Sequence, residues 1–333
     1  MDTEYAYAVA RIRAVGKKLL DKSGIDRMVD AKTAEDALKV LIDIDYGYSS
    51  GDLISAYEYE RLLKEESKKV FTLLRDIAPQ PEIFDLFLQS NDYHNLKVIL
   101  KSEFLGNEDN SNILLDSATI PVNKLKIMVR ERKLSEMPGI MRNAVEECIE
   151  SFNRTGDPQV IDLILDRANY SQMVKNAAEI KNDFLIDLVK IMIDLANIKT
   201  FLRVRSMKKS WDFLQKVLLP GGRIERGTFV KMLQDSLDNA VNILKFTPYD
   251  KVCEEGIADY QKNGSMSKFE KLADNFITKY VRKALFINLG VEPLIAYLIA
   301  KEVEIRNARI IMVGKINGIS NEIIRERLRE AYV

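Results

Sequence analysis

A nine-residue pattern that occurs three times constrains the fold of this chain more than any other feature. The copies follow acid-x-x-Asn-apolar-base-x-apolar-apolar and read "DYHNLKVIL" at 92–100, "DLANIKTFL" at 194–202 and "EIRNARIIM" at 304–312. Their asparagines are Asn95, Asn197 and Asn307, separated by 102 and 110 residues. Self-similarity at a nearly constant spacing is typical of one structural unit used repeatedly. The spacing predicts three similar domains.

The polar residues of each copy fall on its apolar side when the segment is placed around a helix at 100° per residue. Asp92 and Asn95 share an arc with Leu96, whereas His94 and Lys97 point away from it. The acid and asparagine of the other copies, Asp194, Asn197, Glu304 and Asn307, occupy equivalent angles. An unpaired buried polar group costs several kcal/mol. We therefore predict that all six are structural residues paired with backbone groups at the end of a neighbouring helix.

Two other interpretations of the pattern stay open. The exposed bases could contact a partner protein, and the candidates are Lys97, Lys199, Arg203 and Arg309. Catalysis is the least favoured, because the single histidine, His94, faces away from the polar pair and has no counterpart in the other copies. No catalytic, cofactor-binding or metal-binding residue is predicted.

The helix starts repeat as well. Pro81, Asp183 and Pro293 each precede their asparagine by 14 residues. Proline suits the first turn of a helix, where its missing N–H has no intrahelical partner, and Asn182 can cap the middle copy. The 333 residues include only 15 glycines and eight prolines, and 30% are charged. This composition and the scarcity of alternating apolar residues predict an all-α fold.

Two polar or turn-forming segments suggest the domain boundaries. These are "GNEDNSN" at 106–112 and "LLPGGRI" at 218–224. They divide the chain into three helical repeat domains, 1–110, 111–219 and 220–333. A single α-solenoid repeats every 33 to about 47 residues, so this period favours separate domains.

Several classes of function are disfavoured. "AVGKKLL" and "IMVGKIN" lack the upstream glycine of a phosphate-binding loop. Lys plus Arg equals Asp plus Glu, at 50 each, so a nucleic-acid partner is not expected, although "TFLRVRSMKKSW" is a local basic run. Cys148 and Cys253 do not form a CxxC pair and are predicted to be buried free thiols. The apolar stretch "ALFINLGVEPLIAYLIA" is interrupted by polar residues, so we expect a cytoplasmic protein without membrane insertion.

Five segments resemble one family. They are "YAYAVARIRAVGKKLL", "NDYHNLKVILKSEF", "DLANIKTFLRVRSM", "LPGGRIERGTF" and "VGKINGISNEIIRERLREAYV". In order and spacing they are similar to the C subunit of prokaryotic vacuolar-type ATPases and ATP synthases, the counterpart of the eukaryotic d subunit.

The resemblance implies a funnel of three helical domains around a pseudo-threefold axis. It also implies a non-catalytic rotor subunit without cofactors, a monomer within its complex, on the cytoplasmic face of the membrane. Its partners would be the central-stalk subunits and the proteolipid ring, between which it passes torque for proton or sodium transport. The alternative is a freestanding helical adaptor with other protein partners.

Overall fold

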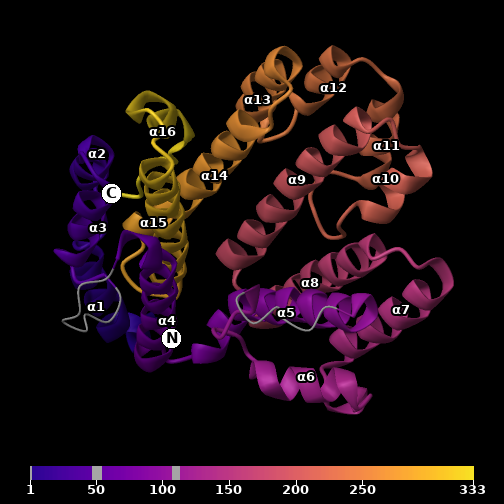
Figure 1. Ribbon diagram of the computed structural model, residues 1–333, viewed down its shortest axis with the longest axis horizontal. Helices are drawn as coiled ribbons and strands as arrows, with labels where there is room; N and C mark the ends of the chain where they lie inside the picture. Colours follow the sequence, from indigo (N-terminus) through magenta and orange to yellow (C-terminus); the bar gives the residue numbers. More distant parts are fainter. Residues whose placement is uncertain (1, 47–54, 107–112) are drawn as a thin grey trace. The chain divides into compact units, whose positions relative to one another are not determined.

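The computed structural model describes residues 2–46, 55–106 and 113–333. Over these ranges the regular structure consists of α-helices and short 3-10 helices, with no strand (Figure 1). The predicted all-α fold is confirmed.

Contacts group the chain into two compact units. We call Met1–Pro81 with Leu244–Val333 the terminal unit, and Glu82–Ile243 the central unit. The predicted boundaries at 110/111 and 219/220 both fall within the central unit, and the three-domain division stays a prediction. Of the segment "GNEDNSN", only Gly106 belongs to the described residues.

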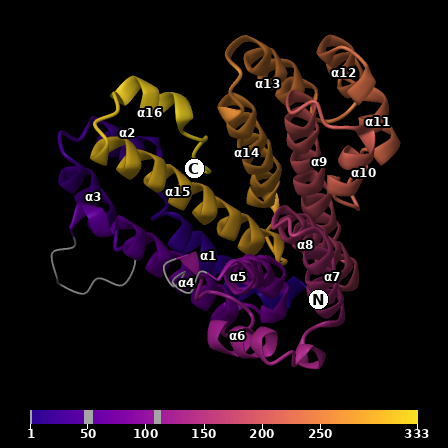
Figure 2. The same cartoon turned by 45° about the vertical axis from the view of Figure 1, so that its right-hand side comes forward.

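The terminal unit is built around one long helix, α15 (Glu292–Ile316). The other helices of this unit are α1 (Ala6–Gly16), α2 (Lys22–Asp30), α3 (Ala34–Ile42), α4 (Tyr59–Ile77), α13 (Asp250–Asn263), α14 (Ser267–Val281), α16 (Asn321–Arg327) and the 3-10 helices η1 (Asp2–Tyr5), η2 (Ala56–Glu58) and η6 (Arg282–Phe286). Helices α1 to α4, α14 and α16 all contact α15 (Figure 2).

The central position of α15 explains why the stretch before residue 301 is so apolar. Every residue from 293 to 301 is buried, as expected for a helix that is covered on all sides. None of the helices in the described ranges is long and apolar enough to cross a membrane.

The central unit contains the helices of the middle of the chain. They are η3 (Pro81–Phe84, whose proline belongs to the terminal unit), α5 (Asp85–Leu105), α6 (Val122–Arg130), η5 (Leu134–Glu136), α7 (Gly139–Thr155), α8 (Gln159–Ile180), α9 (Asp183–Ser206), α10 (Trp211–Val217), α11 (Arg226–Gln234) and α12 (Leu237–Leu244, whose last residue belongs to the terminal unit). Helix α8 packs against α5, α7 and α9, and α9 contacts α10 and α11.

Local chemistry accounts for the starts of the three repeat helices. Asn182 caps α9 by accepting a hydrogen bond from the N–H of Leu185 at 2.9 Å, which confirms the predicted cap. Pro81 opens the 3-10 turn that leads into α5, and Pro293 is the second residue of α15. Both prolines stand where a backbone N–H has no partner within the helix.

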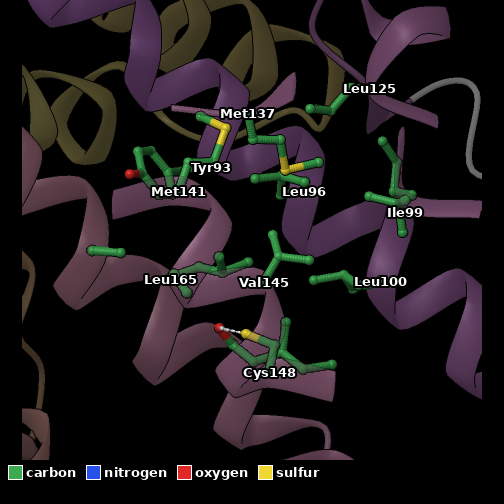
Figure 3. Close-up of a cluster of buried hydrophobic side chains, with 14 of the residues drawn as sticks. Tyr93, Leu96, Ile99, Leu100, Leu125, Met137, Met141, Val145, Cys148 and Leu165 are labelled. Atoms are coloured by element: carbon green, nitrogen blue, oxygen red, sulfur yellow. Dashed lines mark hydrogen bonds between the residues drawn. The ribbon is translucent and has the colours of Figure 1, made fainter. Parts of the chain in front are cut away.

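The core between α5, α6, α7 and α8 is continuous (Figure 3). Leu96 and Leu100 of α5 face Val145 and Cys148 of α7 across it, and Leu165 enters from α8. This packing fixes the exposed and buried faces of α5, and so decides which side chains of the first repeat are covered.

The two thiols provide a test of this packing. Cys148 and Cys253 are free and buried, and burial raises the pKa of each to about 12. A thiol rather than a thiolate at pH 8 is a poor nucleophile. We expect neither to react with Ellman's reagent in the native chain, and both to react in denaturant. The variants Cys148→Ala and Cys253→Ala show which thiol accounts for which part of the reaction in denaturant. Rapid reaction of the native protein would contradict the burial of the thiols.

Candidate functional site

Each repeat asparagine pairs its side-chain amide with both backbone groups of one residue further along the chain. Asn95 donates to the carbonyl of Leu115 at 2.9 Å and accepts from the N–H of the same residue at 2.8 Å. The corresponding pairs are Asn197 with Leu219, at 3.0 and 2.8 Å, and Asn307 with Arg329, at 3.0 and 2.9 Å. An amide side chain carries a donor and an acceptor side by side, so it holds the backbone in one orientation.

The acid three residues earlier holds a second point of the same segment in the first two repeats. Asp92 accepts from the N–H of Ile120 at 2.9 Å and from the hydroxyl of Thr119 at 2.5 Å. Asp194 accepts from the N–H groups of Arg223 and Ile224, both at 3.1 Å. We call such an acid and asparagine, together with the backbone they bind, a clamp.

All six side chains of the three clamps are buried, each at most 5% exposed. Burial raises the pKa of Asp92, although its hydrogen bonds from Thr119 and Ile120 act in the opposite direction. The carboxylates are therefore held by directed bonds to N–H groups and do not face solvent. Such groups are suited to fixing a chain segment.

The glycine pair at 221–222 belongs to the second clamp. A Cβ on Gly222 would lie 2.2 Å from Oδ1 of Asp194, and Gly221 has a φ of 91°. The first glycine therefore allows the turn, and the second allows the backbone to approach the carboxylate. The sequence suggested a turn between domains here, and the structure places this turn against α9.

The third clamp binds two segments that are distant in the sequence. Asn307 holds Arg329, whereas Glu304 accepts from the N–H of Leu20 at 2.5 Å, 284 residues earlier. Leu20 stands two positions before the start of α2. Ile120 and Ile224 stand equally far before α6 and α11. The segment at Leu20 thus donates to the acid of α15 the backbone hydrogen bond that the segments at Ile120 and Ile224 donate to the acids of α5 and α9.

A buried ion cluster accompanies the third clamp and was not foreseen from the sequence. The Nζ of Lys301 lies 2.7 Å from Oε1 of Glu66 and 2.7 Å from Oε1 of Glu304, and 4.8 Å above the ring of Tyr46. Burial by itself lowers the pKa of Lys301, but Glu304 and Glu66 outweigh this effect and raise it. The ammonium therefore stays charged.

Two features of the sequence could have indicated this cluster. The third repeat has the longer acid Glu304 where the others have Asp. Three positions before the acid, Lys301 replaces the uncharged Gln89 and Ile191 of the other repeats. Glu66 lies 235 residues away and has no pattern of its own.

The predicted interface bases interact with other residues of the chain. Lys97 pairs with Asp166 at 2.5 Å, and Arg309 binds Glu60 through two nitrogens at 2.7 and 3.1 Å. Lys199 and Arg203, both on α9, also interact within the chain. A role of these four bases in binding stays a prediction. In the part of the chain that the structure describes, no group of three or more His, Cys, Asp or Glu side chains is arranged to hold a metal ion.

Comparison with known proteins places this architecture in a family. The model of the ATP synthase (C/AC39) subunit family matches residues 8–327. The chain belongs to this family. It is therefore related to a subunit of a rotary ATPase other than the catalytic one.

Individual relatives align over nearly the whole chain. The C subunit of the V-type sodium ATPase of Enterococcus hirae is 26% identical over 332 residues, 99% of each chain. The C subunit of the A-type ATP synthase of Methanocaldococcus jannaschii is 25% identical and is aligned over 97% of this chain and 86% of its own. That of a Desulfurococcus species is 28% identical over 97% and 90%. The resemblance seen in the sequence is thus confirmed.

The first prediction from the clamps concerns Asn95. Asn95→Leu removes both bonds to Leu115 and leaves a backbone N–H and carbonyl unpaired, so we expect a loss of about 2–4 kcal/mol in the free energy of unfolding. Urea denaturation followed by circular dichroism measures it. Asn143→Leu, on an exposed site of α7, is the control and should change stability by less than about 0.5 kcal/mol. Equal midpoints for the two variants would refute a structural role for the clamp.

The second prediction concerns Lys301 of the buried ion cluster. Lys301→Met removes the cation that Glu66 and Glu304 share in the interior, and only Glu66 keeps a second one, Lys69 at 3.6 Å. We therefore expect a loss of about 3–5 kcal/mol in the free energy of unfolding at pH 8. The pKa of Glu304 is already raised by burial. Because a raised carboxyl pKa favours the protonated folded form, the loss should shrink at pH 5. Lys18→Met, which removes an exposed pair with Asp45, should cost less than about 1 kcal/mol at either pH.

Proposed function

We propose that this chain is the rotor subunit that couples the central stalk to the proteolipid ring of a rotary ATPase and passes torque between them. The family match over residues 8–327 carries this proposal. In it the chain is a monomer within the complex, peripheral on the cytoplasmic face of the membrane, and drives proton or sodium transport. It inserts no helix into the bilayer and binds no nucleic acid.

The clamps support a mechanical role. A subunit that transmits torque must resist sliding of its helices against their neighbours. Apolar contacts alone tolerate small sliding movements, whereas a bidentate hydrogen bond is satisfied in one register only. Three clamps at corresponding positions of their helices therefore stiffen the molecule at three points.

The N-terminal segment, which the chain does not connect directly to α15, is fastened to the C-terminal part of the terminal unit by polar contacts. They are Arg309 to Glu60 at 2.7 Å, Arg325 to Asp30 at 2.8 Å, and the Nζ of Lys315 to the carbonyl of Ala31 at 2.7 Å. With the buried cluster at Lys301, these bonds oppose opening of the unit where no peptide bond does so. A coupler that works under torque needs this resistance.

The proposal includes three similar helical domains around a pseudo-threefold axis, in the form of a funnel that receives the stalk. The threefold recurrence of the clamp supports it. Lys97, Lys199, Arg203 and Arg309 are the proposed stalk-facing bases. Lys97 and Arg309 would have to exchange their present partners, Asp166 and Glu60, for groups of the stalk.

The second candidate is a freestanding helical adaptor, since the same clamps would stiffen any scaffold. The two functions differ in their partners. A coupler binds both the stalk and the ring, whereas an adaptor binds neither.

A pull-down with the purified chain tests the proposal. The central-stalk subunits and the detergent-solubilised proteolipid ring from the same cells are offered separately, with an unrelated helical protein of similar net charge as control. Retention of both above the control is the expected result. Retention of neither would reject the coupling role and favour the adaptor.

A further inference from the structure

A pocket of about 190 Å³ opens on the terminal unit between α1, η6, the first turns of α15 and the segment at Tyr332 and Val333. Its walls include Ile12, Leu285 and the ring of Tyr297, and Arg13 and Lys17 also line it. No acidic side chain contributes to the lining among the residues that the structure describes. The pocket is therefore apolar in its interior and positively charged at two of its lining residues.

Exposed apolar residues follow the pocket residue Leu285 in the sequence. Leu285 is 50% exposed, and its neighbours Phe286 and Leu289 are 88% and 37% exposed. Exposed large apolar side chains close together in the chain are typical of sites of protein interaction. The pocket is smaller than the roughly 300–1,000 Å³ of a small-molecule site, and its size suits one large apolar side chain.

Gly16 lines this pocket and offers a position from which it can be filled. It is the last residue of α1, its backbone is not left-handed, and a Cβ added to it would meet no atom within 4 Å. Neither backbone conformation nor packing requires glycine there, and glycine is a poor helix former. A small side chain at this position is therefore accommodated, whereas a large one would extend toward the space that Ile12 and Leu285 also line.

The basic groups at the pocket determine the charge of its occupant. Arg13 donates through one nitrogen to the carbonyl of Ile287 at 2.9 Å and to Oδ1 of Asn288 at 3.1 Å, which fixes its position. Lys17 makes no hydrogen bond or ion pair with any residue that the structure describes. A fixed guanidinium and a free ammonium beside an apolar pocket complement carboxylates that flank an apolar side chain.

We propose that this pocket docks an acidic segment of a neighbouring subunit, which inserts one leucine or phenylalanine between α1 and η6 and places its carboxylates on Arg13 and Lys17. The inference rests on the proposed function, because the partner is sought within the rotary complex. To the proposed function it adds the place on the chain where a subunit binds and the chemistry of the segment that binds there.

The test combines a blocked pocket with a photocrosslinker. Gly16→Trp fills the space and Gly16→Ala leaves it open, and p-benzoylphenylalanine at Phe286 reports which protein lies beside it. The stalk subunits and the solubilised ring are offered separately, and circular dichroism verifies that both variants fold. We expect a crosslink to an acidic segment of one subunit in the Gly16→Ala background, and at least tenfold less in the Gly16→Trp background.

Charge reversal provides an independent measurement. Lys17→Glu should weaken binding of that subunit about tenfold at low salt and less at high salt, because exposed charges are screened. Lys262→Glu, on the exposed surface of α13, is the matched control and should leave binding unchanged. Equal loss in both variants would show a general effect of charge and contradict the pocket.

The outcomes separate this inference from the function on which it rests. Equal crosslinking in both Gly16 backgrounds, crosslinks only to detergent, lipid or a second copy of the chain, or no crosslink to a subunit that is still pulled down would overturn the pocket and leave the coupling role intact. Failure of the wild-type chain to bind stalk and ring would reject both.

Discussion

The pairing of a buried side-chain amide with both backbone groups of a distant residue is the interaction on which this structure depends. Most buried polar groups in folded proteins are hydrogen-bonded, and Asn95, Asn197 and Asn307 are bonded in the same way. Each fixes a segment beyond its own helix. The clamps and the apolar cores together fix the register of the helices.

The third clamp shows how the same device joins the two ends of a chain. In the first two repeats the acid and the asparagine hold one continuous loop, so the clamp closes a short segment. On α15 they hold Arg329 and Leu20, which belong to opposite ends of the sequence. Closing so long a separation costs more chain entropy than closing a short loop, and the cluster of Lys301, Glu66 and Glu304 adds bonds at this point.

These clamps and ion pairs account for stiffness, whereas recognition needs exposed groups. The bases expected to meet a partner from their position on the repeat helices, such as Lys97 and Arg309, already have internal partners. The pocket beside Gly16 combines the charged groups of Arg13 and Lys17 with accessible apolar surface. The proposed coupling role needs both properties, and the terminal unit has the third clamp on α15 and the pocket beside α1.

The sequence alone determined the all-helical fold, the recurrence of the polar pairs and their place on the apolar arc, because helical periodicity and capping are local properties of the chain. It also indicated the family, through motifs in a constant order. Only the tertiary structure decided that Asn95 binds Leu115, that Glu304 binds Leu20, and that Glu66 meets Lys301. Such partners depend on which distant segments the packed cores bring together, and no local pattern marks Leu20 or Glu66 for that role.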